Sequence, residues 1–258
     1  MEYIGQDAAA IEKYLCRRKV KVLAYDTADS TNNVAKKLLA DGAQGEYIIT
    51  AQQQTAGRGR QGKSFFSPKG SGAYFTLIMY PMYQGGQAAD FTLVTSAMAA
   101  AVSQSIDAVF DVRTQIKWVN DIYLDGKKIC GILAEAVVKG FDTAIVVGIG
   151  INITTDTEDF PEELKDKAGS LGKSVDSGLL IAQIADRAFS YCDNLQADDI
   201  IPYCRERSCV IGKEIVFFEG GREYKAFAED IDSCGGLAVR LENGEKRVLR
   251  GGEISVRI

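Results

Sequence analysis

The chain has 258 residues, 46% of them hydrophobic and 25% charged, as expected for a globular protein of one large domain with or without a small one. Its formal net charge of -5 does not indicate a nucleic-acid-binding surface. Histidine is absent, which excludes Ser-His-Asp triads, histidine acid–base catalysis and histidine-ligated metal centres.

The cysteines and the N-terminus predict a cytoplasmic protein. Six cysteines are scattered without a Cys-x-x-Cys pair, so we expect reduced, mostly buried thiols rather than a disulfide framework or a zinc site. The N-terminal stretch "MEYIGQDAAAIEKYLCRRK" lacks the apolar core and cleavage site of a signal peptide. No run approaches the roughly 18 apolar residues that a membrane helix needs.

The N-terminal third predicts alternating helices and strands. Residues 7–18 have the pattern of a short amphipathic helix, and "VKVLAY" (20–25) that of a strand. The stretch "DSTNNVAKKLLADG" predicts a helix that stops at Gly42 and begins at three residues that favour the N-terminal cap, Asp29, Ser30 and Thr31. Two more strands are predicted at 46–52 and 72–80, on either side of a polar, glycine-rich loop.

The remaining two thirds of the chain predict further helices and strands, and then a C-terminal region of strands alone. In chain order we expect a long helix (87–109), strand–turn–strand–hairpin–strand (112–140) with its tight turn at Asp125-Gly126, an apolar strand (143–153) and two helices (176–196 and 198–207). From Gly212 onward only short strands and glycine turns are predicted. The expected fold is therefore an α+β domain over 1–210 followed by a small all-β domain over 211–258.

The loop "GRGRQGKS" (57–64) matches both G-x-G-x-x-G and G-x-x-x-x-G-K-[ST]. Both patterns require a helix after the glycines, but Ser67-Pro68 and Gly70 would break one at its start. We therefore reject both a dinucleotide fold and a P-loop. Four cations without an acid, Arg58, Arg60, Lys63 and Lys69, still make this loop a candidate anion-binding segment; a solvated basic loop is the alternative.

Several blocks together make the chain resemble the biotin–protein ligases, which attach biotin to carrier proteins. They are "DSTN" (29–32), "QTAGRGRQG" (54–62) with "FFSP" (65–68), "KWVNDIYLDGKKICGILAE" (117–135), "GIGINI" (148–153) and "GGEISVR" (251–257). The resemblance implies a mixed-sheet catalytic domain, of the class II synthetase and biotin–lipoate ligase kind, followed by a small SH3-like β-barrel. Only 28 residues precede "DSTN", so we expect the ligase-only form without a DNA-binding domain.

The resemblance also implies a reaction in two steps. Biotin and ATP, with Mg²⁺, give biotinoyl-5′-AMP and pyrophosphate, and a lysine of a biotin carboxyl carrier protein then takes the biotin and releases AMP. Two anions must meet in the first step, so the site needs cations and oriented donors more than a proton relay. We expect no protein-held metal and no DNA or membrane partner, and a homodimer is left open.

The site residues carried over from the resemblance fall into three sets. The catalytic set is Lys128, Arg58 and Arg60. The biotin-binding set is Ser30, Thr31, Asn32, Gln54, Gly57, Arg58, Gly59, Arg60, Lys128 and Gly131. The nucleotide-binding set is Arg60, Lys117, Asn120, Asp121, Lys128 and Asn152.

The residues themselves leave several alternatives open. Both faces of the strand around Lys127 and Lys128 are apolar, so alternation does not select either lysine, and both could lie in solvent. Ser30 to Asn32 could be a plain helix cap, and Trp118 could be a core residue instead of a stacking platform. The segment "DKAGSLG" (166–172) supplies no aromatic residue for adenine. A lipoate–protein ligase and a non-catalytic biotin-binding module are the rival functions.

Overall fold

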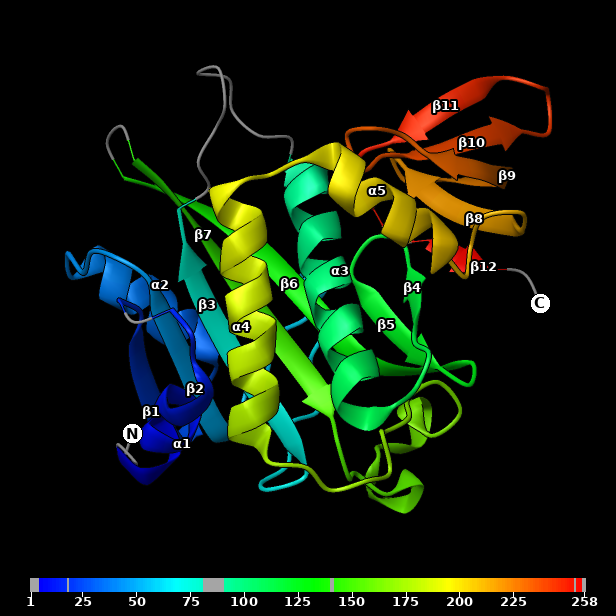
Figure 1. Ribbon diagram of the computed structural model, residues 1–258. Helices are drawn as coiled ribbons and strands as arrows, with labels where there is room; N and C mark the ends of the chain where they lie inside the picture. Colours follow the sequence, from blue (N-terminus) through cyan, green and yellow to red (C-terminus); the bar gives the residue numbers. More distant parts are fainter. Residues whose placement is uncertain (1–4, 18, 81–90, 140–141, 253, 257–258) are drawn as a thin grey trace.

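The computed structural model describes residues 5–17, 19–80, 91–139, 142–252 and 254–256 (Figure 1). Its helices are α1 (Gly5–Tyr14), α2 (Thr31–Ala40), α3 (Phe91–Phe110), α4 (Ser177–Asp193) and α5 (Ala197–Glu206). The strands of the first sheet are β1 (Lys21–Ala28), β2 (Tyr47–Gln54), β3 (Gly72–Met79), β4 (Gln115–Lys117), β5 (Asp121–Leu124), β6 (Lys127–Lys139) and β7 (Asp142–Asn152). The second sheet contains β8 (Glu214–Glu219), β9 (Arg222–Ile231), β10 (Leu237–Leu241), β11 (Lys246–Leu249) and β12 (Ile254–Val256).

The larger sheet has seven strands in the order β1-β2-β3-β7-β6-β5-β4. Only β1 and β2 run parallel, and every other neighbouring pair is antiparallel. The smaller sheet is antiparallel throughout, in the order β11-β10-β9-β8-β12. The predicted α+β fold, a mixed sheet followed by a small all-β unit, is confirmed.

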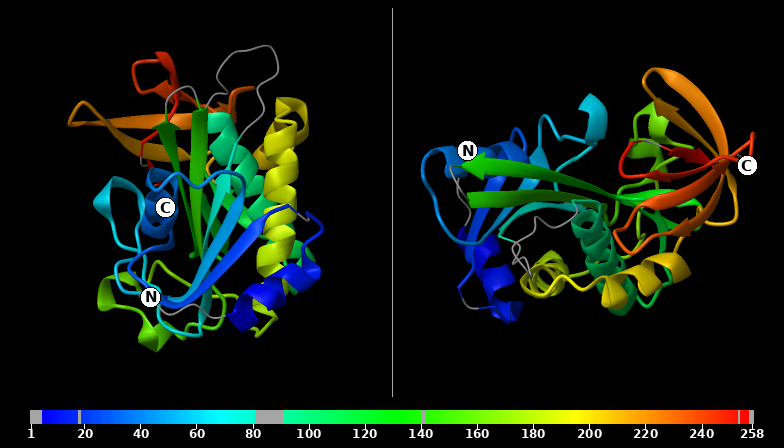
Figure 2. Two further views of the ribbon diagram at one scale, coloured as in Figure 1. Left: turned by 90° about the vertical axis from the view of Figure 1, so that its left-hand side faces the viewer. Right: turned by 90° about the horizontal axis from the view of Figure 1, so that it is seen from above.

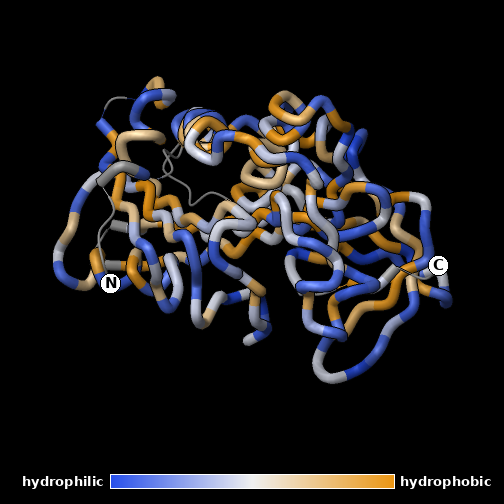
Figure 3. The backbone as a smooth tube through the Cα atoms, turned by 90° about the horizontal axis from the view of Figure 1, so that it is seen from below, coloured by the Kyte–Doolittle hydropathy of each residue, from blue (hydrophilic) through white to orange (hydrophobic). Residues whose placement is uncertain are grey.

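The two faces of the large sheet carry different layers (Figure 2). On β3, Phe75, Leu77 and Met79 belong to the main core with α3 and α4, whereas Ile78 packs in a smaller cluster beneath α2. This division follows from the alternation of side chains along a strand. Hydrophobic segments run through this interior, and hydrophilic ones lie mainly along peripheral loops (Figure 3).

Helix α3 is long and apolar enough to meet a length-and-hydropathy criterion for a membrane span, alone among the described helices. The sequence-based statement that no segment comes near such a length was therefore too strong. Its apolar window is 72% buried, and the helix packs against α4, α5 and the sheet. The apolarity is thus that of a core helix covered on several sides.

Hydrogen bonds hold the C-terminal part of the chain against β4, α3 and the residues that follow β4. The main chain of Ile116 hydrogen bonds with Arg207 and Cys209, just before the second sheet begins. Trp118 Nε1 donates to the carbonyl oxygen of Gly235 at 2.8 Å, and Thr92 Oγ1 donates to that of Arg250 at 2.8 Å. The second sheet is thereby held beside β4 and the start of α3 (Figure 1).

The predicted elements are all present, with ends displaced by a few residues. The expected helix 87–109 appears as α3 from Phe91, and residues 87–90 lie outside the described part of the chain. Asp125 and Gly126 both have positive φ, 50° and 77°, as the predicted tight hairpin turn requires. All six cysteines are free, and three of them, Cys130, Cys192 and Cys204, are buried, so half of the thiols and not most of them lie in the interior.

The glycine loop folds back on itself as a hairpin. Gly59 N donates to Lys63 O at 2.7 Å, and Phe65 N donates to Gly57 O at 2.9 Å. Between them lies a single 3₁₀ turn, Arg60–Gly62, and no helix begins at Lys63 or Ser64. The rejection of the dinucleotide fold and the P-loop is confirmed.

Candidate active site

A cavity of about 220 Å³ lies on the α2 side of the large sheet, beneath the glycine hairpin. Twelve of the predicted site residues line it: Ser30, Thr31, Asn32, Gln54, Arg58, Gly59, Arg60, Lys117, Asn120, Asp121, Lys128 and Gly131. The structure therefore brings together segments that lie about 100 residues apart in the sequence. Its further lining residues include Lys63, Phe65, Trp118, Leu133, Gly148, Gly150, Leu164, Gly252 and Ile254.

The floor of the cavity is made of glycines on neighbouring strands. Gly131 on β6 pairs with Gly150 on β7, and Gly148 lies two residues earlier on the same face. A Cβ added to Gly148 would lie 2.2 Å from Asn32 Oδ1, and one on Gly150 would lie 2.5 Å from the Phe65 ring. Any larger residue would therefore displace the side chains that form the walls.

One end of the cavity is a network of hydroxyl and amide groups that continues to the carboxylate of Glu135. Gln54 Oε1 accepts hydrogen bonds from Thr31 N at 2.9 Å and from Thr31 Oγ1 at 3.1 Å. Thr76 Oγ1 lies 2.8 Å from Thr31 Oγ1 and 2.7 Å from Asn32 Oδ1. The amide of Asn32 then donates to Glu135 Oε2 at 3.0 Å. Each group at this polar end is held by its neighbours, and Thr31, Asn32 and Thr76 are buried.

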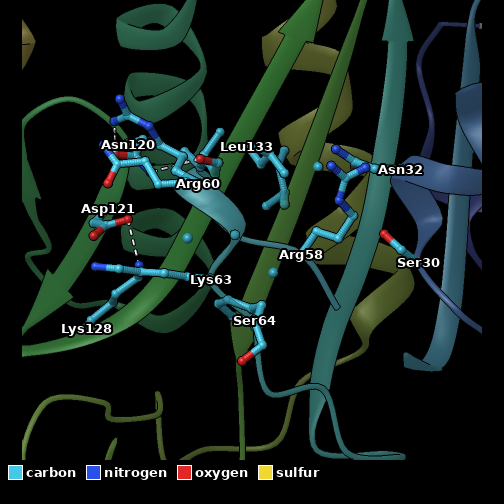
Figure 4. A pocket seen from close by; sticks show the side chains of 18 of the residues that line it. Ser30, Asn32, Arg58, Arg60, Lys63, Ser64, Asn120, Asp121, Lys128 and Leu133 are labelled. Carbon is cyan, nitrogen blue, oxygen red and sulfur yellow. Dashed lines mark hydrogen bonds and ion pairs between the residues drawn. The ribbon is translucent and has the colours of Figure 1, made fainter. Parts of the chain in front are cut away.

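Ser30 occupies the N-cap position of α2 but does not cap the helix with its side chain. The residue is nevertheless buried, and it lies on the cavity wall beside Asn32 (Figure 4). Ser30 is therefore the cap residue by its backbone position, but its side chain belongs to the cavity wall and does not cap the helix. Its hydroxyl, which can both donate and accept, is placed at the polar end.

The opposite end carries the cations. Lys128 Nζ forms an ion pair with Asp121 Oδ1 at 2.7 Å, and Arg60 donates to Asn120 Oδ1 at 2.8 Å (Figure 4). Asn120 Nδ2 donates in turn to Ile132 O at 2.9 Å, which fixes the orientation of the amide that Arg60 contacts. With Lys63 and Lys117 also on the wall, four positive side chains surround one carboxylate at this cationic end.

A β-bulge decides between the two adjacent lysines. The register of β5 against β6 runs from Ile122–Cys130 to Tyr123–Lys128 and so passes over Ile129. The extra residue reverses the alternation, so Lys128 lies on the cavity side together with Gly131. Lys127 instead donates to the carbonyl oxygen of Lys165 at 3.3 Å. The structure thus places Lys128 in the site and Lys127 outside it.

The two arginines of the hairpin point to opposite ends of the cavity (Figure 4). Arg60 reaches Asn120 at the cationic end, as described above. Arg58 donates to Asn33 Oδ1 at 3.1 Å and lies 3.8 Å from Glu135 Oε1, next to α2. Arg58 therefore ties the hairpin to α2 in this structure, and only Arg60 stands among the cations.

Two predicted site residues do not line the cavity. A Cβ on Gly57 would lie 2.3 Å from Phe65 O and 2.8 Å from Ser67 Oγ, so this glycine permits the close packing of the hairpin. Asn152 lies at the end of β7, where its Nδ2 donates to Gly169 O at 3.0 Å. Its buried Oδ1 has no hydrogen-bond partner within the described part of the chain.

Several wall residues were not predicted from the sequence. Leu133, Gly148 and Gly150 could have been found, because they alternate with buried residues on strands already identified. Ile254 lies on β12 of the C-terminal sheet and Gly252 lies just before that strand; both belong to the block "GGEISVR", but nothing in the sequence indicated that they line the cavity. Trp118 belongs to the hydrophobic core, with 4% of its surface exposed, and it also lines the cavity.

The segment just before residues 166–172, which supply no aromatic residue for adenine, contributes an aliphatic side chain to the cavity wall. Leu164 lines the cavity, while Phe160 is buried and packs on Phe66 with 5.9 Å between ring centroids. The aromatic residues on the cavity wall are Phe65 and Trp118. In the part of the chain that the structure describes, no cluster of three or more Cys, Asp or Glu residues could hold a metal ion.

Comparison with known proteins agrees with this geometry. Residues 24–152 match the biotin/lipoate A/B protein ligase family, and residues 210–257 match the biotin protein ligase C terminal domain. The biotin–[acetyl-CoA-carboxylase] ligase of Paracoccus denitrificans is 31% identical over 88% of this chain and 96% of its own length. The bifunctional ligase/repressor BirA of Bacillus spizizenii is 37% identical over 63% of this chain, but the match spans only about half (51%) of that protein.

The fold has a close counterpart among solved structures. The biotin protein ligase from Aquifex aeolicus, in complex with biotin and ATP, superposes with a TM-score of 0.74 over 92% of this chain and 98% of that one, at 23% identity. Both sheets, and not only the larger one, are therefore part of a known arrangement. The chain belongs to the biotin/lipoate A/B protein ligase family, and within it to the biotin protein ligases.

Proposed function

We propose that this protein activates biotin with ATP and transfers it to a lysine of a biotin carboxyl carrier protein. The observation that carries the proposal is the division of one cavity into an end lined mainly by hydroxyl and amide groups, called the polar end, and an end where four cations gather. A ureido group offers a carbonyl acceptor and two N–H donors, which suit the hydroxyls and amides of the polar end. A carboxylate and phosphates suit the lysines and arginine of the cationic end.

The first step would join two anions. A carboxylate oxygen of biotin attacks the α-phosphorus of ATP, the bond to pyrophosphate breaks, and biotinoyl-5′-AMP is formed. Lys128 and Arg60 are proposed to offset the repulsion between the reactants and the charge that develops on the phosphate. Lys117, Asn120, Asp121 and Asn152 are the proposed nucleotide contacts, and Arg58 as a direct ligand of the anions stays a prediction.

Mg²⁺ would enter with ATP as part of the substrate. Among the described residues, Asp121 is the one carboxylate on the cavity wall, and it is already paired with Lys128. This wall fits an ion that would be held mainly by phosphate oxygens, with Asp121 and the amide oxygen of Asn120 as the protein groups that would help to hold it. Such an ion would supply charge neutralisation on the phosphates.

In the second step, the amine of the acceptor lysine attacks the acyl carbon of the mixed anhydride. AMP leaves, an amide bond forms, and the amine proton is released to solvent. The biotin-binding roles of Ser30, Thr31, Asn32, Gln54 and Gly131 are proposed on the same geometry. The domain boundary at residue 210, the cytoplasmic location, the choice of carrier and a homodimer stay predictions.

Biotin-dependent ATP–pyrophosphate exchange tests the proposal directly. We expect exchange with biotin and none with lipoate. Exchange with lipoate alone would indicate the lipoate ligase, and biotin binding without exchange would indicate a non-catalytic module. ATP hydrolysis that is independent of biotin would contradict the assignment altogether.

A further inference from the structure

Glu135 is an ionisable residue beside the polar end that the proposed mechanism does not use. It follows Gly131 and Leu133 at alternate positions on β6, so its side chain leaves the same face of the sheet as theirs. The side chain is 23% exposed, and it faces α2 just beyond the cavity wall. Glu135 can therefore influence the wall residue Asn32, which it contacts, without lining the cavity itself.

The two oxygens of Glu135 have different partners. Oε2 accepts from Asn32 Nδ2 at 3.0 Å. Oε1 accepts from Lys36 Nζ at 2.6 Å and lies 3.8 Å from the guanidinium of Arg58. Both cations thus face one oxygen, and the neutral amide faces the other.

This arrangement fixes which way the amide of Asn32 points. An ionised carboxylate only accepts hydrogen bonds, so the amide must turn its NH₂ group to Glu135 and its oxygen to Thr76. Close packing against Gly148 leaves the side chain little room to move elsewhere. An amide turned over by 180° would exchange donor and acceptor on the cavity wall.

Charge keeps Glu135 in its acceptor-only form. Burial raises the pKa of its carboxyl group, but hydrogen bonds from Lys36 and Asn32, together with the positive charges of Lys36 and Arg58, bring it below the ordinary value. The group is therefore ionised at neutral pH, and Asn32 has one stable orientation under those conditions.

We propose that Glu135 is a positioning residue that sets the donor–acceptor pattern of Asn32 and thereby the recognition of the cyclic urea of biotin. The proposal rests on the proposed function for its ligand. The orientation of the Asn32 amide is set by Glu135 and Thr76 and does not depend on any ligand. Glu135 touches no reacting atom and should affect biotin binding much more than chemistry.

The decisive variant is Glu135→Gln, which keeps the shape and removes the charge. Lys36 and Arg58 only donate hydrogen bonds, so they will retain the oxygen of the new amide and turn its NH₂ group toward Asn32. The NH₂ group of Asn32 would then face another NH₂ group, unless the Asn32 amide rotates by 180°. We expect the Kd for biotin, measured by calorimetry without ATP, to rise about 10- to 100-fold. The KM for ATP should change less than about twofold.

A second substitution should reverse the effect. Lys36→Met in the Glu135→Gln background removes the nearer of the two cations, at 2.6 Å against 3.8 Å for Arg58, and so lets the new amide present its oxygen to Asn32. We expect the double variant to recover most of the biotin affinity, and Lys36→Met alone to have little effect. Glu229→Gln is the matched control, because Glu229 also lies between two cations, Arg240 and Lys246, but on the C-terminal sheet. It should leave biotin affinity unchanged.

A ligand-free measurement separates this inference from the proposed function. The side-chain amide NMR signal of Asn32, assigned by its loss in Asn32→Asp, should shift in Glu135→Gln and return in the double variant. Wild-type protein that fails to bind biotin would remove the proposed function, and the NMR result would still decide the role of Glu135. Wild-type biotin affinity in Glu135→Gln, equal weakness in the single and double variants, or an unmoved Asn32 signal would each overturn the proposal.

Discussion

The two ends of the cavity are built on different physical principles. At the polar end, short buried side chains hold one another, and the orientation of each is set by a partner, as Thr31 is by Gln54. At the cationic end, long charged side chains reach the cavity, such as Lys128, whose side chain is 33% exposed and paired with Asp121. The first end is suited to recognise one rigid shape, and the second to follow charge as it moves during a reaction.

The largest effect is expected at the cationic end. Lys128→Ala should lower kcat/KM for biotin-dependent pyrophosphate exchange by about 10³-fold, because it removes a charge from the point where two anions meet. Biotin binding without ATP should be weakened far less. Lys127→Ala is the matched control, since Lys127 points to Lys165 O. Normal pyrophosphate exchange in Lys128→Ala would contradict the assignment of the reaction step to the cationic end.

A methyl group added to the floor tests the rigidity of the polar end. Gly148→Ala would place its Cβ 2.2 Å from Asn32 Oδ1, so Asn32 must move. We expect the Kd for biotin to rise about 10²-fold, because several linked hydrogen bonds are disturbed together. Gly251→Ala, whose Cβ would meet nothing within 4 Å, serves as the control in the same calorimetric assay. Unchanged biotin affinity in Gly148→Ala would show that the polar end is adaptable.

Salt distinguishes the two ends without any mutation. Exposed charges are screened over about 10 Å at 0.1 M ionic strength and about 3 Å at 1 M, whereas buried neutral hydrogen bonds are hardly affected. Over this range the KM for ATP should rise severalfold, while the Kd for biotin should rise less, because biotin brings one carboxylate to the cationic end and ATP brings several phosphate charges. Similar salt dependence for both substrates would contradict the comparison.

The smallest effect concerns the bond between the two sheets. Trp118→Phe removes the hydrogen bond to Gly235 O and should lower the free energy of unfolding by about 1–2 kcal/mol. Urea unfolding should be followed by circular dichroism, because the chain has a single tryptophan. Biotin affinity should stay within about twofold of wild type, and a larger loss would mean that the indole itself contacts the ligand.

Sequence patterns predicted the fold better than the fine geometry of the site. The strands and helices have strong hydrophobic periodicity, so their existence and order could be predicted, as for α3 and β7. Periodicity could not choose between Lys127 and Lys128, because the bulge at Ile129 depends on the pairing of β6 with β5. It could not place Gly252 either, since only the packing of the second sheet brings that residue to the cavity.

Most of the site residues that the resemblance implied line the cavity, but their separate tasks could not be predicted from it. Arg58 and Arg60 belong to one motif, yet their partners lie at opposite ends of the cavity. Glu135 stands in the same sequence block as Lys128, and nothing in its sequence context distinguishes it from a solvent-facing residue. Its partners Asn32 and Lys36 lie about 100 residues away and meet it only through the docking of α2 on the sheet.

The contribution of Gly252 and Ile254 to the cavity wall makes ligand binding a property of both sheets. A ligand that binds only when this wall is complete raises the free energy of unfolding of every element needed to complete it, by RT ln(1 + [L]/Kd). The C-terminal strands should therefore become more protected from hydrogen exchange when nucleotide binds, although most of the wall belongs to the other sheet. A chain truncated between the sheets would lose this shared stabilisation along with part of its binding site.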